Sequence, residues 1–420
     1  MTDDAKYPPP QPAAPRLAGL VVGDPAWLAA EQARLLGFAR GARVPDGFGW
    51  LDDRGAVRDD GCVHTWITCR MTHVFALARL CGDRDAADLV DHGLAALSGP
   101  LYDREHGGWY TGVDGDGRPL SAEKSAYTHA FVVLAAAGAT AAGRPGARDL
   151  LTRSLDTIER HFWSEAEGRL VESWDLPWQL CENYRGANAN MHAVEAFLAA
   201  GDVTGEPVWH ARALRIARHV VHEHARAARW RLVEHFDAHW TPQYEYNRNR
   251  PDDPFRPFGS TIGHWFEWAR LLLGLHAGMP TPPDWLLHDA EALFAAGVRE
   301  GWNVDGEPGF VYTVDRAGEP VVRARMHWVL TEAIAAAAVL HRVTGNADYQ
   351  YWYRTWWTHA DEVFIDHTHG SWHHELTPRN TPAASVWPGK PDIYHALQAT
   401  LIPRLPPAPA IAEALRRRLS

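Results

Sequence analysis

The 420-residue chain has no apolar run that approaches the roughly 20 residues a membrane-spanning helix needs. It also has no lysine- or arginine-rich stretch, and its formal net charge is -11. Nucleic acid and anionic membrane surfaces are therefore not expected as partners. The first residues, MTDDAKYPPPQPAAPRLAG, hold acids and prolines where a secretory signal would need a basic and then an apolar segment. We expect a cytoplasmic protein in which residues 1–20 form a flexible tail.

Cysteine is scarce, with four residues in the chain, and no two of them form a Cys-x-x-Cys pair. They are expected to be reduced and mostly buried thiols, which argues against a disulfide framework or a zinc site. The sequence also lacks a phosphate-binding loop, a dinucleotide fingerprint and a nucleophile elbow. Tryptophan, by contrast, is abundant, with 20 residues, and its flat apolar face suits both protein cores and sugar-binding surfaces.

Helix-like segments of two kinds alternate along the chain. The first kind is amphipathic, as in residues 84–99, and lies at a surface. The second is apolar nearly all round, as in residues 131–143, and is buried on most sides. Segments of the second kind recur about every 60 to 75 residues and give six pairs. The pattern predicts an all-α fold, an (α/α)6 barrel of six inner and six outer helices in a single domain over residues 21–420, with an open α-solenoid as the alternative.

Polar or aromatic residues stand at the start of each apolar helix. They are Trp66, Arg70 and His73, then Tyr127 and His129, Asn188 and His192, His264 and Glu267, Trp328 and Glu332, and Tyr394 and His395. Any one of them taken alone is more often a structural residue. A buried polar group is costly unless it is paired, so their repetition favours one shared pocket over six separate structural roles. Such a pocket also suits a closed barrel better than a solenoid.

His264 and Glu267 form the sharpest element of this pattern, because a carboxylate one turn from an imidazole can hold the ring and raise its pKa into the working range of an acid/base. Arg70 could instead be a simple ion-pair partner of Glu267. No metal is expected at His264-x-x-Glu267, which lacks a second histidine four residues on. None is expected in the histidine-rich stretch 366–375 either, which is predicted to be a loop without an acidic framework.

Four stretches resemble the N-acylglucosamine 2-epimerase superfamily, and most of all its aldose–ketose isomerase members. They are RMTH at 70–73, ANANMH at 187–192, PFRPFGSTIGHWFEWARLLL at 254–273 and WPGKPDIYHALQATLIP at 387–403. The resemblance covers nearly the whole chain after the tail. It implies an (α/α)6 barrel that works without a metal or organic cofactor. It also implies a reaction in which a sugar ring opens and loses the proton next to its carbonyl, giving an enediolate.

The resemblance also assigns roles to residues. It implies that His264 and His395 do the acid/base work and that Arg70 meets the developing oxyanion, a role that suits a group that stays charged. Glu267 and His192 match the rest of the catalytic set. The implied substrate contacts are Trp66, Tyr127, Asn188, Arg256, Trp328, Glu332 and Trp387.

The implied reaction is the interconversion of D-mannose and D-fructose by a monomer or homo-oligomer acting on a monosaccharide. A sugar 2-epimerase would use the same parts, but it returns the proton to C2 from the opposite face rather than to C1 on the same face. Sulfoquinovose is an alternative substrate, although no sulfonate site can be identified. An inverting glycoside hydrolase would need two carboxylates, for which Glu267, Glu332 and Asp392 are candidates. A non-catalytic sugar-binding protein would need the tryptophans but not His264 and His395.

Overall fold

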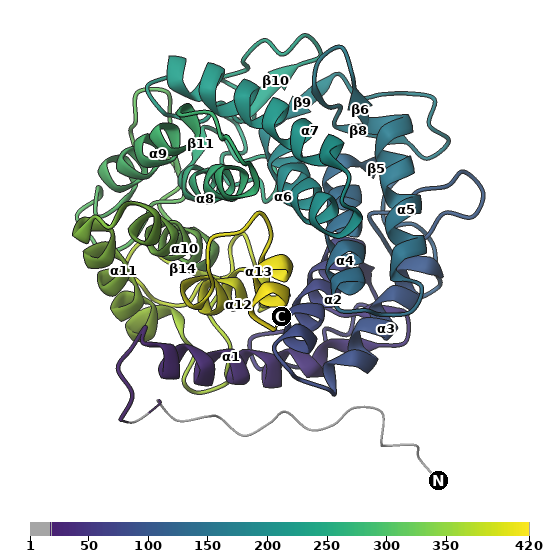
Figure 1. The fold of residues 1–420 in the computed structure, drawn as a ribbon, viewed down its shortest axis with the longest axis horizontal. Helices are drawn as coiled ribbons and strands as arrows, with labels where there is room; N and C mark the ends of the chain where they lie inside the picture. Colours follow the sequence, from purple (N-terminus) through teal and green to yellow (C-terminus); the bar gives the residue numbers. More distant parts are fainter. Residues whose placement is uncertain (1–16, 18, 420) are drawn as a thin grey trace.

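The computed structural model describes residue 17 and residues 19–419, so the predicted tail at residues 1–20 lies almost wholly outside the described residues. Two concentric rings of helices surround the centre of the molecule (Figure 1). The inner ring consists of α2 (Thr65–Leu80), α4 (Ala126–Ala141), α6 (Ala187–Thr204), α8 (Ile262–Gly278), α10 (His327–Thr344) and α12 (Tyr394–Leu401). The outer ring consists of α1 (Pro25–Ala39), α3 (Ala86–Ser98), α5 (Ala147–Thr157), α7 (Pro207–Ala217), α9 (Trp285–Gly301) and α11 (Ala347–His359).

The inner ring is closed. Each inner helix packs against the next along the chain, and α12 packs against both α10 and α2. Each outer helix packs against at least one inner helix. This order confirms the predicted (α/α)6 barrel and excludes the open solenoid, whose first and last helices would not meet.

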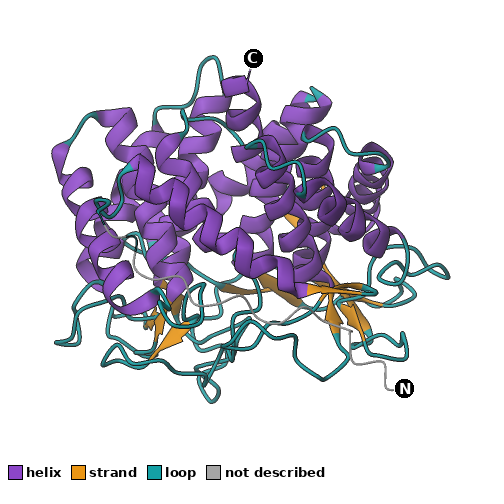
Figure 2. Cartoon of the chain, turned by 90° about the horizontal axis from the view of Figure 1, so that it is seen from below, coloured by secondary structure: helices purple, strands orange, loops and turns teal. Residues whose placement is uncertain are grey.

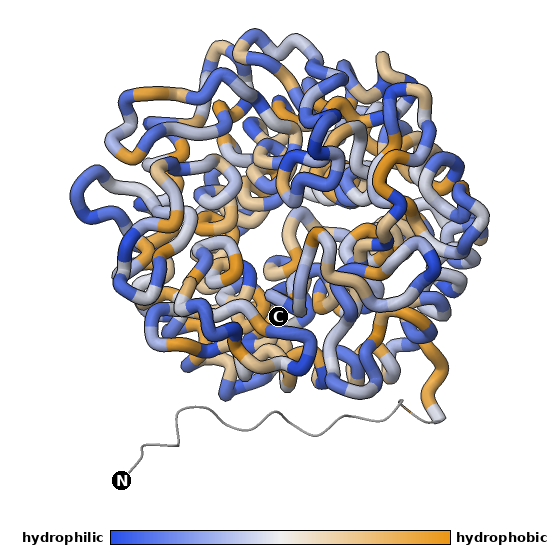
Figure 3. Tube along the Cα trace, turned by 180° about the vertical axis from the view of Figure 1, so that it is seen from behind, coloured by the Kyte–Doolittle hydropathy of each residue, from blue (hydrophilic) through white to orange (hydrophobic). Residues whose placement is uncertain are grey.

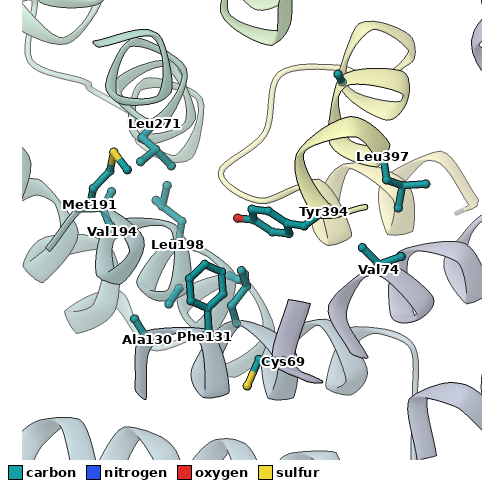
Figure 4. Packing of buried hydrophobic residues seen from close by; sticks show 14 of the residues in the cluster. Cys69, Val74, Ala130, Phe131, Met191, Val194, Leu198, Leu271, Tyr394 and Leu397 are labelled. Carbon is teal, nitrogen blue, oxygen red and sulfur yellow. The ribbon is translucent and has the colours of Figure 1, made fainter. Parts of the chain in front are cut away.

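Burial separates the two rings as the sequence pattern predicts. In α2 every residue except Arg79 is buried, whereas α3 exposes a polar face that includes Asp88. Figure 4 shows side chains of α2, α4, α6, α8 and α12 converging, with Phe131 and Tyr394 near the middle. Seen from the opposite face, hydrophilic stretches lie on the outlying loops (Figure 3). Gly345 ends α10 in the left-handed conformation, at φ 71°, which is common for glycine at the end of a helix.

Short antiparallel ladders, which the sequence did not predict, connect successive loops at one end of the barrel (Figure 2). In each ladder the first strand directly precedes an inner helix and its partner lies in the next loop. The pairs are β3 (Val63–His64) with β4 (Gly112–Val113), β5 (Glu123–Ser125) with β8 (Ser173–Asp175), β9 (Tyr184–Gly186) with β10 (His235–Asp237), β11 (Ser260–Thr261) with β12 (Thr313–Val314), and β13 (Arg325–Met326) with β14 (Glu375–Leu376). Two further hairpins lie within single loops: β1 (Arg43–Val44) with β2 (Gly47–Phe48), and β6 (Trp163–Ser164) with β7 (Arg169–Leu170).

Hydrogen bonds between the first and last of these loops complete the circle. The indole of Trp50 donates to the carbonyl of Pro388 at 2.8 Å, and the backbone N–H of Lys390 donates to the carbonyl of Leu51 at 2.8 Å. The starts of the inner helices are therefore held in one connected rim.

The opposite end of the barrel carries a helix that the sequence did not predict, α13 (Ile411–Leu419), which packs against α2, α4 and α6 near the C-terminus (Figure 2). Short helical segments make up the remaining elements. They are the 3-10 turns η1 (Arg40–Ala42) and η5 (Ile402–Arg404) and the π-helical segments η2 (Ile158–Phe162), η3 (Arg218–Ala225) and η4 (Ala360–Phe364). Within the described part of the chain, none of the helices has the length and apolar character needed to span a bilayer.

Candidate active site

A cavity opens at the end of the barrel where the inner helices begin. It brings together ten of the twelve site residues predicted from the sequence, and Arg256 and Glu332 do not line it. The ten are Trp66, Arg70, Tyr127, Asn188, His192, His264, Glu267, Trp328, Trp387 and His395. The structure therefore places polar residues from all six inner helices, or from the loops beside them, around one space.

His264 has a carboxylate partner, but it is Glu234 rather than the predicted Glu267. Nδ1 of His264 lies 3.1 and 3.0 Å from the two carboxylate oxygens of Glu234, which comes from the loop before β10. Glu267 turns instead toward the barrel axis, where its Oε1 lies 3.8 Å from Nδ1 of His192 and 3.6 Å from Nη2 of Arg270. The predicted pairing within α8 is wrong because the two side chains leave the helix toward different neighbours.

His395 has a matching arrangement. Its Nδ1 lies 2.9 Å from Oε1 of Glu332, and Arg270 donates from Nε to the other oxygen of Glu332 at 2.8 Å. Glu332 thus stands behind His395, out of the cavity. Burial, together with the charge of Arg70, holds the pKa of His395 well below its usual 6.5. His395 is then a neutral imidazole at neutral pH, with Nε2 left for a ligand.

Trp328 packs close to both histidines. Its ring centroid is 5.2 Å from that of His264 and 5.7 Å from that of His395, with interplanar angles of 39° and 32°. The cavity therefore presents two imidazoles, each held at Nδ1 by a buried carboxylate, beside one indole.

Arg70 is fixed from several sides. It donates from Nη1 to Asp392 and from Nη2 to the hydroxyl of Tyr127, each at 3.1 Å. Its guanidinium carbon lies 4.7 Å from the ring centroid of Phe131 and 4.9 Å from that of Tyr394. Burial alone would lower the pKa of Arg70, but Tyr127 and Asp392 raise it, so the guanidinium stays charged. Asp392, rather than Glu267, is its ion-pair partner.

The floor of the cavity is a network of buried carboxyl groups. Burial and the nearby charge of Glu332 raise the pKa of Glu267 well above its usual 4.5. Glu195 behaves in the opposite way. Burial alone would raise its pKa, but His192, Arg270 and a hydrogen bond from the Tyr394 hydroxyl hold it well below the usual range.

Arg256 and two of the histidines near the starts of the inner helices have other places in the structure. Arg256 donates to both oxygens of Glu182, at 2.7 and 2.9 Å, and lines an adjoining pocket. His73 faces a second cavity near α13. His129 is fully buried, and its Nε2 accepts the backbone N–H of Trp109 at 3.1 Å.

Several residues of the cavity were not in the predicted set. They are Phe255, Tyr312, His327, His374 and Asp392 from the lining, with Glu234 behind it. His327 begins α10 and could have been found by the rule that selected its neighbour Trp328. Its ring stacks on that of His374 with a centroid distance of 3.9 Å. Tyr312 and Glu234 lie in loops, where no local pattern marks them.

Among residues 17 and 19–419, one group of side chains is close enough together to hold a metal ion: His192, Glu195 and Glu267. Arg270 already brings a positive charge to this group, with Nη1 3.8 Å from Glu195 and Nη2 3.6 Å from Glu267. A guanidinium there competes electrostatically with a cation. The histidines of residues 366–375 form no such group within the described residues.

Two imidazoles held by carboxylates, a fixed guanidinium and an aromatic wall are groups that could together transfer protons on a small polar molecule. The family model for N-acylglucosamine 2-epimerase matches residues 47–399. The chain belongs to this family, as the sequence resemblance predicted.

Comparison with individual proteins gives a consistent result. A D-mannose isomerase of Thermobifida fusca is 57% identical over 392 residues, which cover 93% of this chain and 96% of that protein. A D-mannose isomerase of Pseudomonas cannabina pv. alisalensis is 52% identical over 393 residues, covering 93% of this chain and 94% of that protein. A crystal structure of a D-mannose isomerase, 29% identical, has a TM-score of 0.84 and covers 89% of this chain and 96% of that chain.

Proposed function

We propose that the protein is a cofactor-independent aldose–ketose isomerase that interconverts D-mannose and D-fructose through a cis-enediolate. The observation that carries the proposal is the pair of cavity histidines, each held at Nδ1 by a buried carboxylate. An α-proton beside a carbonyl needs a base that is neutral near pH 7, and His395 meets that condition. The 57% identity to a D-mannose isomerase supports the choice of sugar.

In the proposed mechanism His395 takes the proton from C2 of the open-chain aldose through Nε2. The electron pair left at C2 forms the enediolate, and the negative charge that develops on O1 is met by Arg70. His395 then returns its proton to C1 on the same face. His264 moves the hydroxyl proton from O2 to O1, so that C2 becomes the carbonyl carbon and C1 carries the hydroxyl group.

Incubation with D-mannose in D2O, followed by NMR, tests the proposed function. We expect D-fructose to accumulate with deuterium at C1, because the base exchanges its proton with solvent between the two transfers. Unchanged mannose would contradict the proposal and favour a sugar-binding protein.

A second candidate function is 2-epimerisation, which needs bases on opposite faces of the enediolate. The presence of two histidines, His264 and His395, in one cavity is compatible with it. In the same experiment it would yield D-glucose with deuterium at C2. Inverting hydrolysis is less well supported: Glu332 does not reach the cavity, and Asp392 is paired with Arg70.

Exhaustive EDTA treatment is expected to leave the isomerase activity unchanged. The proposed steps use imidazoles and a guanidinium, and Arg270 supplies positive charge to the carboxyl groups of the floor. Activity is measured before treatment, after it, and after addition of a divalent ion. A loss that the divalent ion restores would contradict the metal-free mechanism.

A further inference from the structure

Glu172 and Glu234 occupy corresponding places in two consecutive loops. Glu172 directly precedes β8, and Glu234 directly precedes β10. The backbone carbonyl of Glu172 accepts the N–H of Ala126, the first residue of α4, at 2.8 Å. The carbonyl of Glu234 accepts the N–H of Ala187, the first residue of α6, at 2.9 Å. The barrel repeat thus places the two glutamates in equivalent positions.

Their side chains also share a structural contact. Glu172 accepts the backbone N–H of Gly186, just before α6, at 3.0 Å, and Glu234 accepts that of Thr261, just before α8, at 3.0 Å. Both side chains are buried, with exposed fractions of 8% and 5%. Each side chain therefore satisfies a backbone donor at the start of the following inner helix. Burial raises the pKa of Glu172 to about 7.

The two glutamates differ in the helix residue that lies beside each carboxylate. Three residues after Thr261 comes His264, whose Nδ1 lies 3.0 Å from Glu234. Three residues after Gly186 comes Ala189, which has no polar side chain. Glu172 lines the pocket beside the active-site cavity rather than the cavity itself. The chain therefore contains one glutamate that only caps a helix and one that caps a helix and holds a cavity histidine.

We propose that Glu234 is the positioning residue of His264, an inference that rests on the proposed function. The carboxylate of Glu234 favours the tautomer of His264 that carries its proton on Nδ1. Nε2 is then unprotonated and faces the substrate. The carboxylate also stabilises the imidazolium that forms when His264 takes the hydroxyl proton of the enediolate. Because Thr261 and α8 hold the carboxylate in place, the ring keeps one orientation against Trp328.

The test compares Glu234→Gln with the matched control Glu172→Gln. A glutamine at either position can still accept the backbone N–H through its amide oxygen, but it cannot ionise. We expect Glu234→Gln to lower kcat for mannose isomerisation by about 10- to 100-fold, with KM little changed. Glu172→Gln should stay within about twofold of the parent, since the amide keeps the cap.

The split between kcat and KM gives a readout that a purely structural role would not change. Parent-like kcat in Glu234→Gln, or an equal loss in Glu172→Gln, would overturn the proposal.

A measurement on the parent protein covers the case in which Glu234→Gln does not fold. In protein labelled with ¹⁵N-histidine, the His264 signals are assigned by their loss in His264→Asn. In the neutral form of the ring they should show a protonated Nδ1 and an unprotonated Nε2. A proton on Nε2 alone would overturn the proposal. This result does not depend on turnover, so it stays informative even if the parent fails to isomerise mannose and the proposed function fails.

Discussion

Replacing His395 with asparagine is expected to abolish nearly all exchange of the C2 proton of mannose while the protein folds and binds sugar as before. Asparagine can keep a polar contact with Glu332 but has no basic nitrogen to accept a proton. Loss of a general base costs about 10²- to 10⁴-fold in rate. The decisive measurement is NMR of hydrogen exchange at C2 of mannose in D2O.

His276→Asn is the matched control. His276 lies in the last turn of α8, at the end of that helix remote from the cavity. The variant should exchange the C2 proton at the parent rate. If His395→Asn also does so, His395 is not the base, and His264 or His192 must take that role.

Replacing Arg70 with lysine is expected to lower kcat by about 10²-fold or more, the loss typical of removing an oxyanion donor. Lysine keeps the charge but cannot bond Asp392 and Tyr127 at the same time through a planar fork. Nor can it fill the space between the rings of Phe131 and Tyr394 in the same way. Steady-state kinetics with mannose measure the effect on kcat and KM.

Arg79→Lys serves as the control on the same helix, since Arg79 is the one residue of α2 that is not buried. It should leave kcat and Tm unchanged. If Arg70→Lys keeps its kcat but loses thermal stability, then Arg70 is a structural ion-pair partner of Asp392 and does not stabilise the enediolate.

The barrel could be predicted from the sequence because its two kinds of helix have different compositions. A helix buried on all sides, such as α4, cannot carry the charges that α3 displays, and the alternation repeats along the chain. The candidate site could be predicted for a related reason. A polar group such as Arg70 or His192 stands out at the start of an apolar helix, where burial is costly without a partner or a ligand.

The partners of these groups could not be predicted, because they come from other loops. His264 and Glu267 share a helix, yet the carboxylate that reaches His264 lies 30 residues earlier. The strands of the rim are two or three residues long, too short for an alternating pattern to appear. Helix α13 falls outside the sixfold repeat on which the prediction depended.

The closure of the rim has a consequence for how the protein is made. Arg70 and Asp392 form an ion pair although they are 322 positions apart in the sequence. Trp50 and Pro388, which share a hydrogen bond, are 338 positions apart. On the ribosome the N-terminal helices emerge first, and α2 must wait for nearly the whole chain before α12 covers its open flank. A nascent or truncated chain therefore shows an uncovered apolar edge and has no active site. Shielding by a chaperone during synthesis would protect it until the last inner helix arrives.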